Sequence, residues 1–193
     1  GRVFGICVEK NSELPLNDKE RKMKGRYVFQ GNQVRDEYND VALFASLGSQ
    51  PATMEGSKIV DAWGLMPGHD EQQADAQQAY VQNDLGGSVQ TFVSIPEEYA
   101  AQQPGWSKFR NPVCLLVKAL YGHPDAGTYW EKHCDEKLKE CGFKRITDWD
   151  SLYYHKEHRC VLMVYVDDFK LSGPADKLPG IWEQIGKKID LDE

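Results

Sequence analysis

The chain has 193 residues, a length typical of one large domain, which argues against a multi-domain enzyme. Its 30 acidic and 23 basic residues give a formal net charge of −7, while 40% hydrophobic and 11% aromatic residues are enough to build a core, which argues against intrinsic disorder. The longest apolar runs, residues 113–117 and 161–166, are far shorter than the roughly 20 residues that span a bilayer, so no membrane partner is expected.

Cysteine usage predicts free thiols in a reducing, intracellular compartment, because the five cysteines are scattered and no leader-like segment precedes them. A zinc site needs about four converging ligands, and His133, Cys134 and Cys141 do not supply them, so ordinary buried thiols are favoured over zinc. Because residue 1 is Gly and the last residues carry no closing signal, we expect a segment of a longer chain.

The N-terminal residues predict two strands around a basic turn. Residues 3–8 are apolar and β-leaning, Pro15 lies in a polar turn, and residues 27–29 return as a strand. Between Lys19 and Arg26, five of eight residues are basic. Taken alone, this run favours a solvated hairpin over a phosphate-contacting arm, and the net charge of −7 also argues mildly against nucleic acid binding.

The middle of the chain predicts one helix and three short strands. Apolar residues share one broad face between residues 54 and 66, with Thr53 as N-cap and a stop near Gly64. A short β segment ends at Asp75 and a second strand is expected at 91–95. The apolar run 113–117 is expected to be a strand buried on both sides.

The C-terminal third predicts a long helix at 124–142, then β-rich runs at 151–155, 160–166 and 169–172, and a last helix that Pro174 opens. This order indicates an α+β fold: a split βαββ (ferredoxin-like) antiparallel sheet backed by the helices at 54–65 and 124–141. We expect Asp75 and the 167–168 turn on adjacent central strands.

Asp167 and Asp168 are expected in a tight turn between two apolar strands. Asp is a common turn residue, so a purely structural explanation exists. Two carboxylates at the end of an interior hairpin repel each other unless solvent or a cation neutralises them, and carboxylate oxygens suit Mg²⁺. A two-metal site needs acids from more than one strand, and Asp75 is the best third candidate because it ends a β segment, with Tyr80 following one turn later.

Four motifs occur in a characteristic order. Residues 24–31 (KGRYVFQG) are similar to KARLVxxG, and residues 74–85, which begin ADAQQAYV and end NDL, are similar to MDVxxA[FY]L followed by GDL. Residues 113–122 end in KALYG, as in xLxKALYG, and Trp130 fits the tryptophan downstream of it. Residues 164–173 (VYVDDFKLSG) are similar to VYVDDxxLxG. Together these motifs resemble the reverse transcriptase segment of copia-type long-terminal-repeat retrotransposon polyproteins.

The resemblance implies an RNA-directed DNA polymerase with a right-hand polymerase fingers and palm fold. Residues 1–193 would form a single fingers-palm domain, with 1–50 mainly fingers and 51–193 mainly palm with interleaved fingers, without thumb or ribonuclease H. The implied partners are an RNA or DNA template with primer, deoxynucleoside triphosphates, and the rest of the polyprotein, including integrase and ribonuclease H. The implied location is a cytoplasmic virus-like particle or the nucleus.

The resemblance also implies a role for individual residues. Asp75, Asp167 and Asp168 are the expected catalytic acids and would bind two Mg²⁺ or Mn²⁺ ions, with the carbonyl of Ala76 as a further ligand. Tyr80 would reject a ribose 2′-hydroxyl. The remaining expected contacts are with the incoming nucleotide, from Lys24, Arg26 and Gly122, and with nucleic acid, from Lys19, Arg21, Lys22 and Tyr165.

Two other functions remain open. The first is a non-catalytic, retroelement-derived relic that binds nucleic acid or is structural. The altered segment 123–128, HPDAGT where the family commonly has LKQAPR, favours it, and so does the segment 44–53, which lacks the family's basic residue. The retained acids argue against it. The second is another metal-dependent nucleotidyl transferase or nuclease. A separation of more than about 8 Å between the carboxylates of Asp75 and Asp167 would exclude shared metal ligation.

Overall fold

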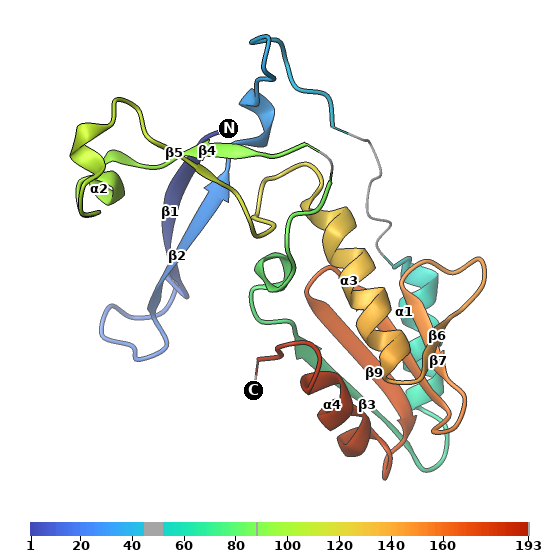
Figure 1. The fold of residues 1–193 in the computed structure, drawn as a ribbon. Helices are drawn as coiled ribbons and strands as arrows, with labels where there is room; N and C mark the ends of the chain where they lie inside the picture. The colour runs from blue at the N-terminus through green and yellow to red at the C-terminus, as the bar shows by residue number, and fades with distance from the viewer. Residues whose placement is uncertain (45–51, 88, 193) are drawn as a thin grey trace. The chain divides into compact units, whose positions relative to one another are not determined.

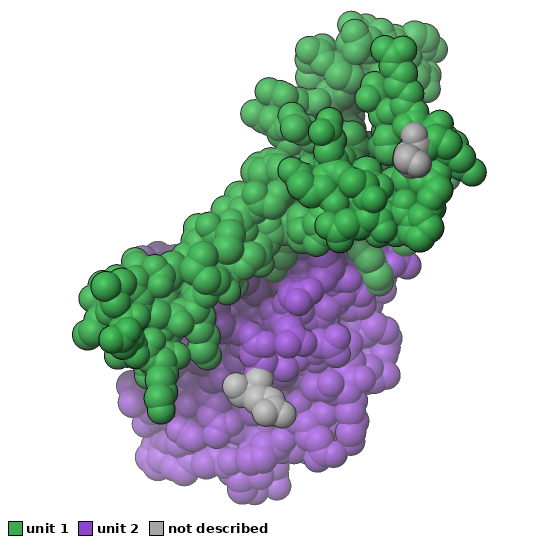
Figure 2. Space-filling model, turned by 90° about the vertical axis from the view of Figure 1, so that its left-hand side faces the viewer, with its two compact units in different colours: residues 1–45, 85–126 green, residues 46–84, 127–193 purple. Residues whose placement is uncertain are grey.

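A computed structural model describes residues 1–44, 52–87 and 89–192. Most of the segment 44–53, which lacks the family's basic residue, therefore lies outside the described residues. The chain divides into two compact units (Figure 2): unit 1 comprises residues 1–45 and 85–126, and unit 2 comprises residues 46–84 and 127–193. Both units combine strands and helices, and every sheet within the described residues is antiparallel (Figure 1). The mixed α and β composition with antiparallel sheets confirms this part of the predicted fold class.

Unit 1 is built on the predicted N-terminal hairpin. Strand β1 (Val3–Lys10) pairs with β2 (Lys22–Phe29) along their whole length, from Val3 opposite Phe29 to Lys10 opposite Lys22. A second ribbon joins β4 (Phe92–Ser94) to β5 (Val113–Leu115). The short helix α2 (Glu97–Ala100) and the 3-10 turns η1 (Gly31–Gln33) and η3 (Trp106–Lys108) complete the unit.

The core of unit 1 is small. Phe29, Val34 and Val93 are buried together, with partly buried side chains around them. The expectation that residues 113–117 form a doubly buried strand is wrong, because Val113 is 58% and Leu115 43% exposed. The physical reason is that β5 pairs with β4 in a two-stranded ribbon and is not an interior strand of a larger sheet.

Unit 2 contains a five-stranded sheet in the order β3-β9-β8-β7-β6, counted over the described residues. Its strands are β3 (His69–Asp75), β6 (Phe143–Arg145), β7 (Leu152–His155), β8 (Cys160–Tyr165) and β9 (Asp168–Pro174). The predicted adjacency of the Asp75 strand and the strand after the turn is confirmed. The prediction that both are central is wrong, because β3 is the edge strand in the described part of the sheet. A single bridge from Ala76 to Leu191 continues beyond its end.

Helices cover both faces of this sheet. Helix α1 (Met54–Gly64) lies on one face, where Val60 packs with Leu152, Val161 and Met163. Helices α3 (Ala126–Glu140) and α4 (Leu178–Gly186) lie on the other face, over the larger core. The Thr53 hydroxyl accepts a hydrogen bond of 3.1 Å from the Gly56 amide, which confirms the predicted N-cap.

Three further expectations can be compared with the described residues. The cysteines are free thiols, as predicted. The last helix begins at Leu178, four residues later than Pro174, because Pro174 still belongs to β9. None of the helices in the described segments is long and apolar enough to cross a membrane.

Candidate active site

Three predicted site residues lie in one row across unit 2. Asp75 at the end of β3 is directly opposite Asp168 at the start of β9, and Asp168 is directly opposite Tyr165 at the end of β8. Residues opposite each other in antiparallel strands place their side chains on the same face, about 4.5–5.5 Å apart at Cβ. All three residues are exposed. The row lies on the face that carries α1, because Met163 and Val161 precede Tyr165 at two-residue steps.

The turn between β8 and β9 contains only Val166 and Asp167. The prediction that Asp168 also lies in the turn is wrong, because Asp168 is the first residue of β9. The Asp167 carbonyl accepts a hydrogen bond of 2.6 Å from the Ala76 amide. This bond ties the turn to the residue that follows Asp75. The Trp130 indole donates a hydrogen bond of 2.6 Å to the Val166 carbonyl.

The acids influence each other's protonation. Partial desolvation, followed by the negative charges of Asp167 and Asp75 and a hydrogen bond with Asp75, raises the pKa of Asp168. Burial and, second, the negative charge of Asp167 raise the pKa of the Tyr80 phenol. The three carboxyl groups and Tyr80 therefore belong to one electrostatic neighbourhood, in which negative charge is costly.

The donor set of this neighbourhood fits a divalent cation by its chemistry. Carboxylates and a peptide carbonyl are the oxygen ligands that Mg²⁺ and Mn²⁺ prefer, and a cation would relieve the repulsion that, after desolvation, contributes to the raised pKa of Asp168. However, no three His, Cys, Asp or Glu side chains of the described residues are already gathered in a metal-binding arrangement. Metal ligation by all three acids would therefore require their carboxyl groups to be gathered more closely than they are here.

The loop after Asp75 is held by a residue that the sequence analysis missed. Tyr80 lies in the 3-10 turn η2 (Ala79–Gln82), with Ala79 fully buried beneath it. The Gln82 side-chain amide donates to the carbonyls of Gln77 and Asp190, at 2.7 and 2.9 Å, and accepts from the Asp190 amide at 3.0 Å. Gln82 thus fastens the Tyr80 loop to the segment after α4.

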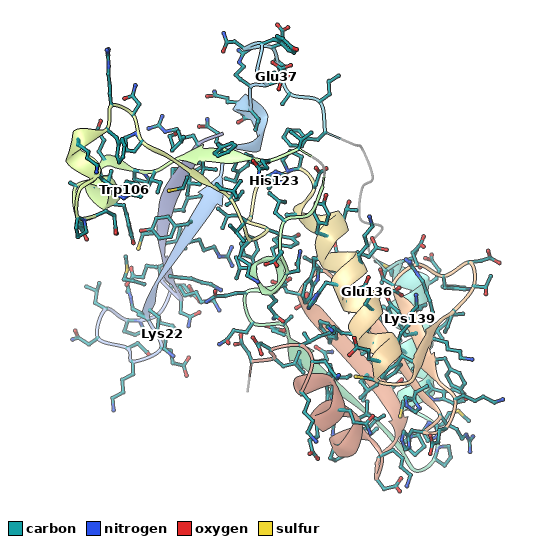
Figure 3. The ribbon with its side chains drawn as sticks, viewed as in Figure 1. Lys22, Glu37, Trp106, His123, Glu136 and Lys139 are labelled. Atoms are coloured by element: carbon teal, nitrogen blue, oxygen red, sulfur yellow. The ribbon has the colours of Figure 1, made fainter. Side chains whose placement is uncertain are left out.

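The basic residues lie in unit 1, where their availability differs. Arg21 makes two hydrogen bonds to the Glu9 carboxylate, at 2.9 and 2.7 Å, and one to the Leu14 carbonyl, and its side chain is only 12% exposed. Lys22 and Lys24 alternate with Met23 on β2, so both lie on one face of the hairpin, together with Arg26. Lys22 lies where β2 begins, next to the turn (Figure 3).

Two of the family motifs, residues 24–31 and 113–122, pack against each other within unit 1. The Arg26 guanidinium lies 5.9 Å from the centre of the Tyr121 ring, and the Phe29 amide donates a 2.7 Å hydrogen bond to the Tyr121 carbonyl. Gly122 has φ +87°, and a Cβ there would lie 2.2 Å from the Phe29 carbonyl oxygen. The described structure therefore gives Gly122 a reason to be glycine that involves no nucleotide.

The altered segment 123–128 begins with a buried histidine. His123 is 6% exposed, and its ring lies against those of Phe29 and Phe44, at 4.9 and 5.2 Å between centroids (Figure 3). Its Nδ1 accepts a 3.2 Å hydrogen bond from the Asp125 amide, and burial lowers the pKa of the ring. A neutral imidazole therefore occupies a core position where the family commonly has leucine.

Comparisons with known proteins agree with these motifs. Residues 9–193 match the family described as reverse transcriptase (RNA-dependent DNA polymerase). The chain belongs to this family. It is also 33% identical over 95 residues to the putative transposon Ty5-1 protein of Saccharomyces cerevisiae, covering 47% of this chain and 30% of that protein. No solved structure matches the chain significantly. The resemblance to a copia-type retrotransposon reverse transcriptase is thus confirmed, and the chain spans about a third of the length of this curated relative.

Proposed function

We propose that this reverse transcriptase family chain is the catalytic core of an RNA-directed DNA polymerase from a retrotransposon polyprotein. The observation that carries the proposal is the exposed row of Asp75, Asp168 and Tyr165, with Asp167 tied to Ala76 beside it. Asp75, Asp168 and Tyr165 come from three neighbouring strands and share one face, and Asp167 lies in the adjoining turn. Acids from more than one strand are what two-metal attack of a primer 3′-hydroxyl on a deoxynucleotide α-phosphate requires.

In this proposal unit 2 is the palm and unit 1 belongs to the fingers of a single fingers-palm domain. The order β3, α3, β8 and β9, with β9 placed between β3 and β8, supports the split βαββ arrangement. The hairpin in unit 1 supplies basic side chains and the palm supplies acids, so nucleotide phosphates and metal ions have separate protein contacts.

Asp75, Asp167 and Asp168, with the carbonyl of Ala76, would hold two Mg²⁺ or Mn²⁺ ions. Bound ions of this kind lower the pKa of the attacking hydroxyl and neutralise charge on the phosphates. The chain's own contribution is to hold the carboxylates on a rigid sheet end. The hydrogen bond from Ala76 to Asp167 fixes the spacing between the two acid-bearing segments.

The remaining assignments concern the substrates. Lys24 and Arg26 would bind the triphosphate, Gly122 would border the nucleotide, and Tyr80 would exclude a 2′-hydroxyl by contact with the sugar. We assign nucleic acid contacts to Lys19, Lys22 and Tyr165, whereas Arg21 holds the hairpin through Glu9. The rest of the polyprotein, in a cytoplasmic particle or the nucleus, completes the proposed setting.

Primer extension on an RNA template tests the proposal. We would compare wild type with Asp75→Asn and with the control Asp70→Asn, in Mg²⁺ and in Mn²⁺, on this chain and on a longer polypeptide that continues into the thumb. Asp70 lies on the same strand but on the other face, where it is exposed. The proposal expects extension by wild type and Asp70→Asn, and at least about a thousandfold less by Asp75→Asn.

The non-catalytic relic is the second candidate, and one observation favours it: the carboxylates of the described residues are not gathered in a metal-binding arrangement. A relic would bind primer and template without extending the primer, in the longer polypeptide as well. Binding without extension in both metals would therefore overturn the polymerase proposal in favour of this alternative.

A further inference from the structure

The turn that carries Asp167 has an unfavourable backbone conformation. Val166 has φ +58°, in the left-handed region. A β-branched residue rarely adopts this conformation, because its side chain collides with its own backbone, so the surrounding structure must hold it there. The strained residue directly precedes Asp167 and lies two residues before Asp168.

Two hydrogen bonds hold this turn, one to the carbonyl of each of its two residues. The Val166 carbonyl accepts from the Trp130 indole, and the Asp167 carbonyl accepts from the Ala76 amide, both at 2.6 Å. The second bond is available only if the chain reverses tightly enough to bring Asp167 back to the end of β3. The first bond therefore supports the second.

Trp130 is well suited to this role. It lies on α3, is 3% exposed, and belongs to the large core of unit 2. An indole has one donor and no acceptor, and a buried indole N–H without a partner is costly. Because the side chain is almost completely buried in this close-packed core, its N–H is a rigid anchor for the Val166 carbonyl and not a flexible contact.

We propose that Trp130 is a positioning residue for the acidic site: its indole N–H holds the strained Val166 turn, and the turn sets Asp167 beside Ala76 and Asp168 opposite Asp75. The geometric part of this inference stands on the hydrogen bonds alone. Its catalytic consequence rests on the polymerase proposed above. The two parts are therefore tested by separate measurements.

The first measurement is amide hydrogen exchange of Ala76, relative to the amide of Ile146, the residue after β6, which donates to the Leu152 carbonyl at 2.9 Å. The variant is Trp130→Phe, which keeps an aromatic ring but removes the donor. The control is Leu138→Ala, which removes a fully buried side chain from the same helix and core. In Trp130→Phe, we expect the exchange rate of the Ala76 amide to rise at least about tenfold more than that of the Ile146 amide. In Leu138→Ala, we expect both rates to rise by the same factor.

A double variant tests whether strain is the reason. Glycine adopts positive φ without penalty, so in a Val166→Gly background the turn no longer depends on the indole. The loss of Ala76 protection caused by Trp130→Phe should then shrink at least about threefold, a non-additivity that lost core packing alone would not produce. An equal loss in both backgrounds would overturn the strain argument and with it the proposal.

The second measurement is single-turnover extension with the same variants, at a temperature where all are folded. We expect Trp130→Phe to lower the extension rate about tenfold and to raise the Mg²⁺ concentration for half-maximal rate, with primer-template affinity unchanged. Leu138→Ala should keep the wild-type values. A wild type that binds primer and template without extending the primer, in the longer polypeptide as well, contradicts the polymerase, while the exchange data still decide the role of Trp130.

If Trp130→Phe fails to fold, the wild-type protein carries the test. Opening of the turn breaks both bonds together, so the Trp130 indole proton and the Ala76 amide should show similar protection. Protection of Ala76 together with rapid exchange of the indole proton would overturn the proposal. Where Trp130→Phe does fold, equal Ala76 protection relative to Ile146 in Trp130→Phe and Leu138→Ala would also overturn it.

Discussion

Asp75 and Asp168 lie directly opposite each other at the ends of neighbouring antiparallel strands, with their side chains on the same face of the sheet. Like charges in this position destabilise a sheet. Partial desolvation, and then the negative charges of Asp167 and Asp75, raise the pKa of Asp168. A fold that keeps such a pair gives up stability at this point, which is typical of a functional site.

Asp168→Asn should therefore stabilise the metal-free protein. Removal of one charge relieves the repulsion with Asp75 and Asp167, and we expect the melting temperature in chelating buffer to rise by about 1–3 °C. Added Mg²⁺ should raise the melting temperature of wild type more than that of the variant. Thermal unfolding with and without Mg²⁺ measures both effects. A variant less stable than wild type in chelator would contradict the repulsion.

Tyr80→Val should weaken discrimination between deoxynucleotides and ribonucleotides. The tyrosine ring lies in η2, close enough to Asp167 for that charge to affect its pKa, so it borders the acidic site. Loss of the ring would remove the proposed clash with a 2′-hydroxyl, and we expect the ratio of the two incorporation rates to fall at least about tenfold. Tyr80→Phe is the control, because it keeps the ring. Equal ratios in Tyr80→Val and Tyr80→Phe would exclude the gate.

Gly122→Ala should disrupt the contact between the motifs at residues 24–31 and 113–122 in unit 1. The new methyl group would lie 2.2 Å from the Phe29 carbonyl oxygen at φ +87°, so we expect a loss of at least about 2 kcal/mol. Exchange of the Phe29 amide, which donates to Tyr121, reports this loss locally. The matched control is Gly180→Ala in α4, where no atom lies within 4 Å of the new methyl, and it should be neutral or stabilising.

His155 should make folding stability fall in mild acid. Burial is the main reason that the pKa of this ring lies below its ordinary value, and the Nδ1 atom accepts from the His158 amide while Nε2 faces the Cys141 carbonyl at 3.1 Å. As pH falls below about 6.5, the unfolded chain takes up a proton that the folded ring resists, so stability is lost by up to about 1.4 kcal/mol per pH unit.

The measurement is urea unfolding of wild type and His155→Gln at pH 7.5 and pH 5. Glutamine does not titrate in this window, so the advantage of wild type over the variant should be larger at pH 7.5 than at pH 5. His123, whose pKa burial also lowers, is present in both proteins and its contribution cancels. An advantage that grows toward pH 5 would show that the folded His155 is charged.

The sequence predicted the elements of unit 2 well, because their signals are local. The apolar periodicity of α3 and the Thr53 cap specify helices directly, and the strand before the Val166 turn is a continuous apolar run. The motifs also brought Asp75 and Asp168 together before their register was known.

Other features depend on tertiary contacts that periodicity does not encode. Residues 113–117 have the composition of an interior strand, but their burial is decided by which strand they pair with. Trp130 fitted a family motif, but the sequence predicted no role for it, because its hydrogen bond to Val166 joins residues 36 positions apart. Gln82 was missed for the same reason, since its partner Asp190 is 108 positions away.

Mn²⁺ binding tests the central claim, that acids from two strand ends form one divalent cation site. The titration would be followed by electron paramagnetic resonance on wild type, Asp167→Asn and the control Asp70→Asn. The account predicts saturable binding to wild type and Asp70→Asn, and an affinity at least about tenfold weaker in Asp167→Asn. Equal affinity in all three proteins would contradict the account.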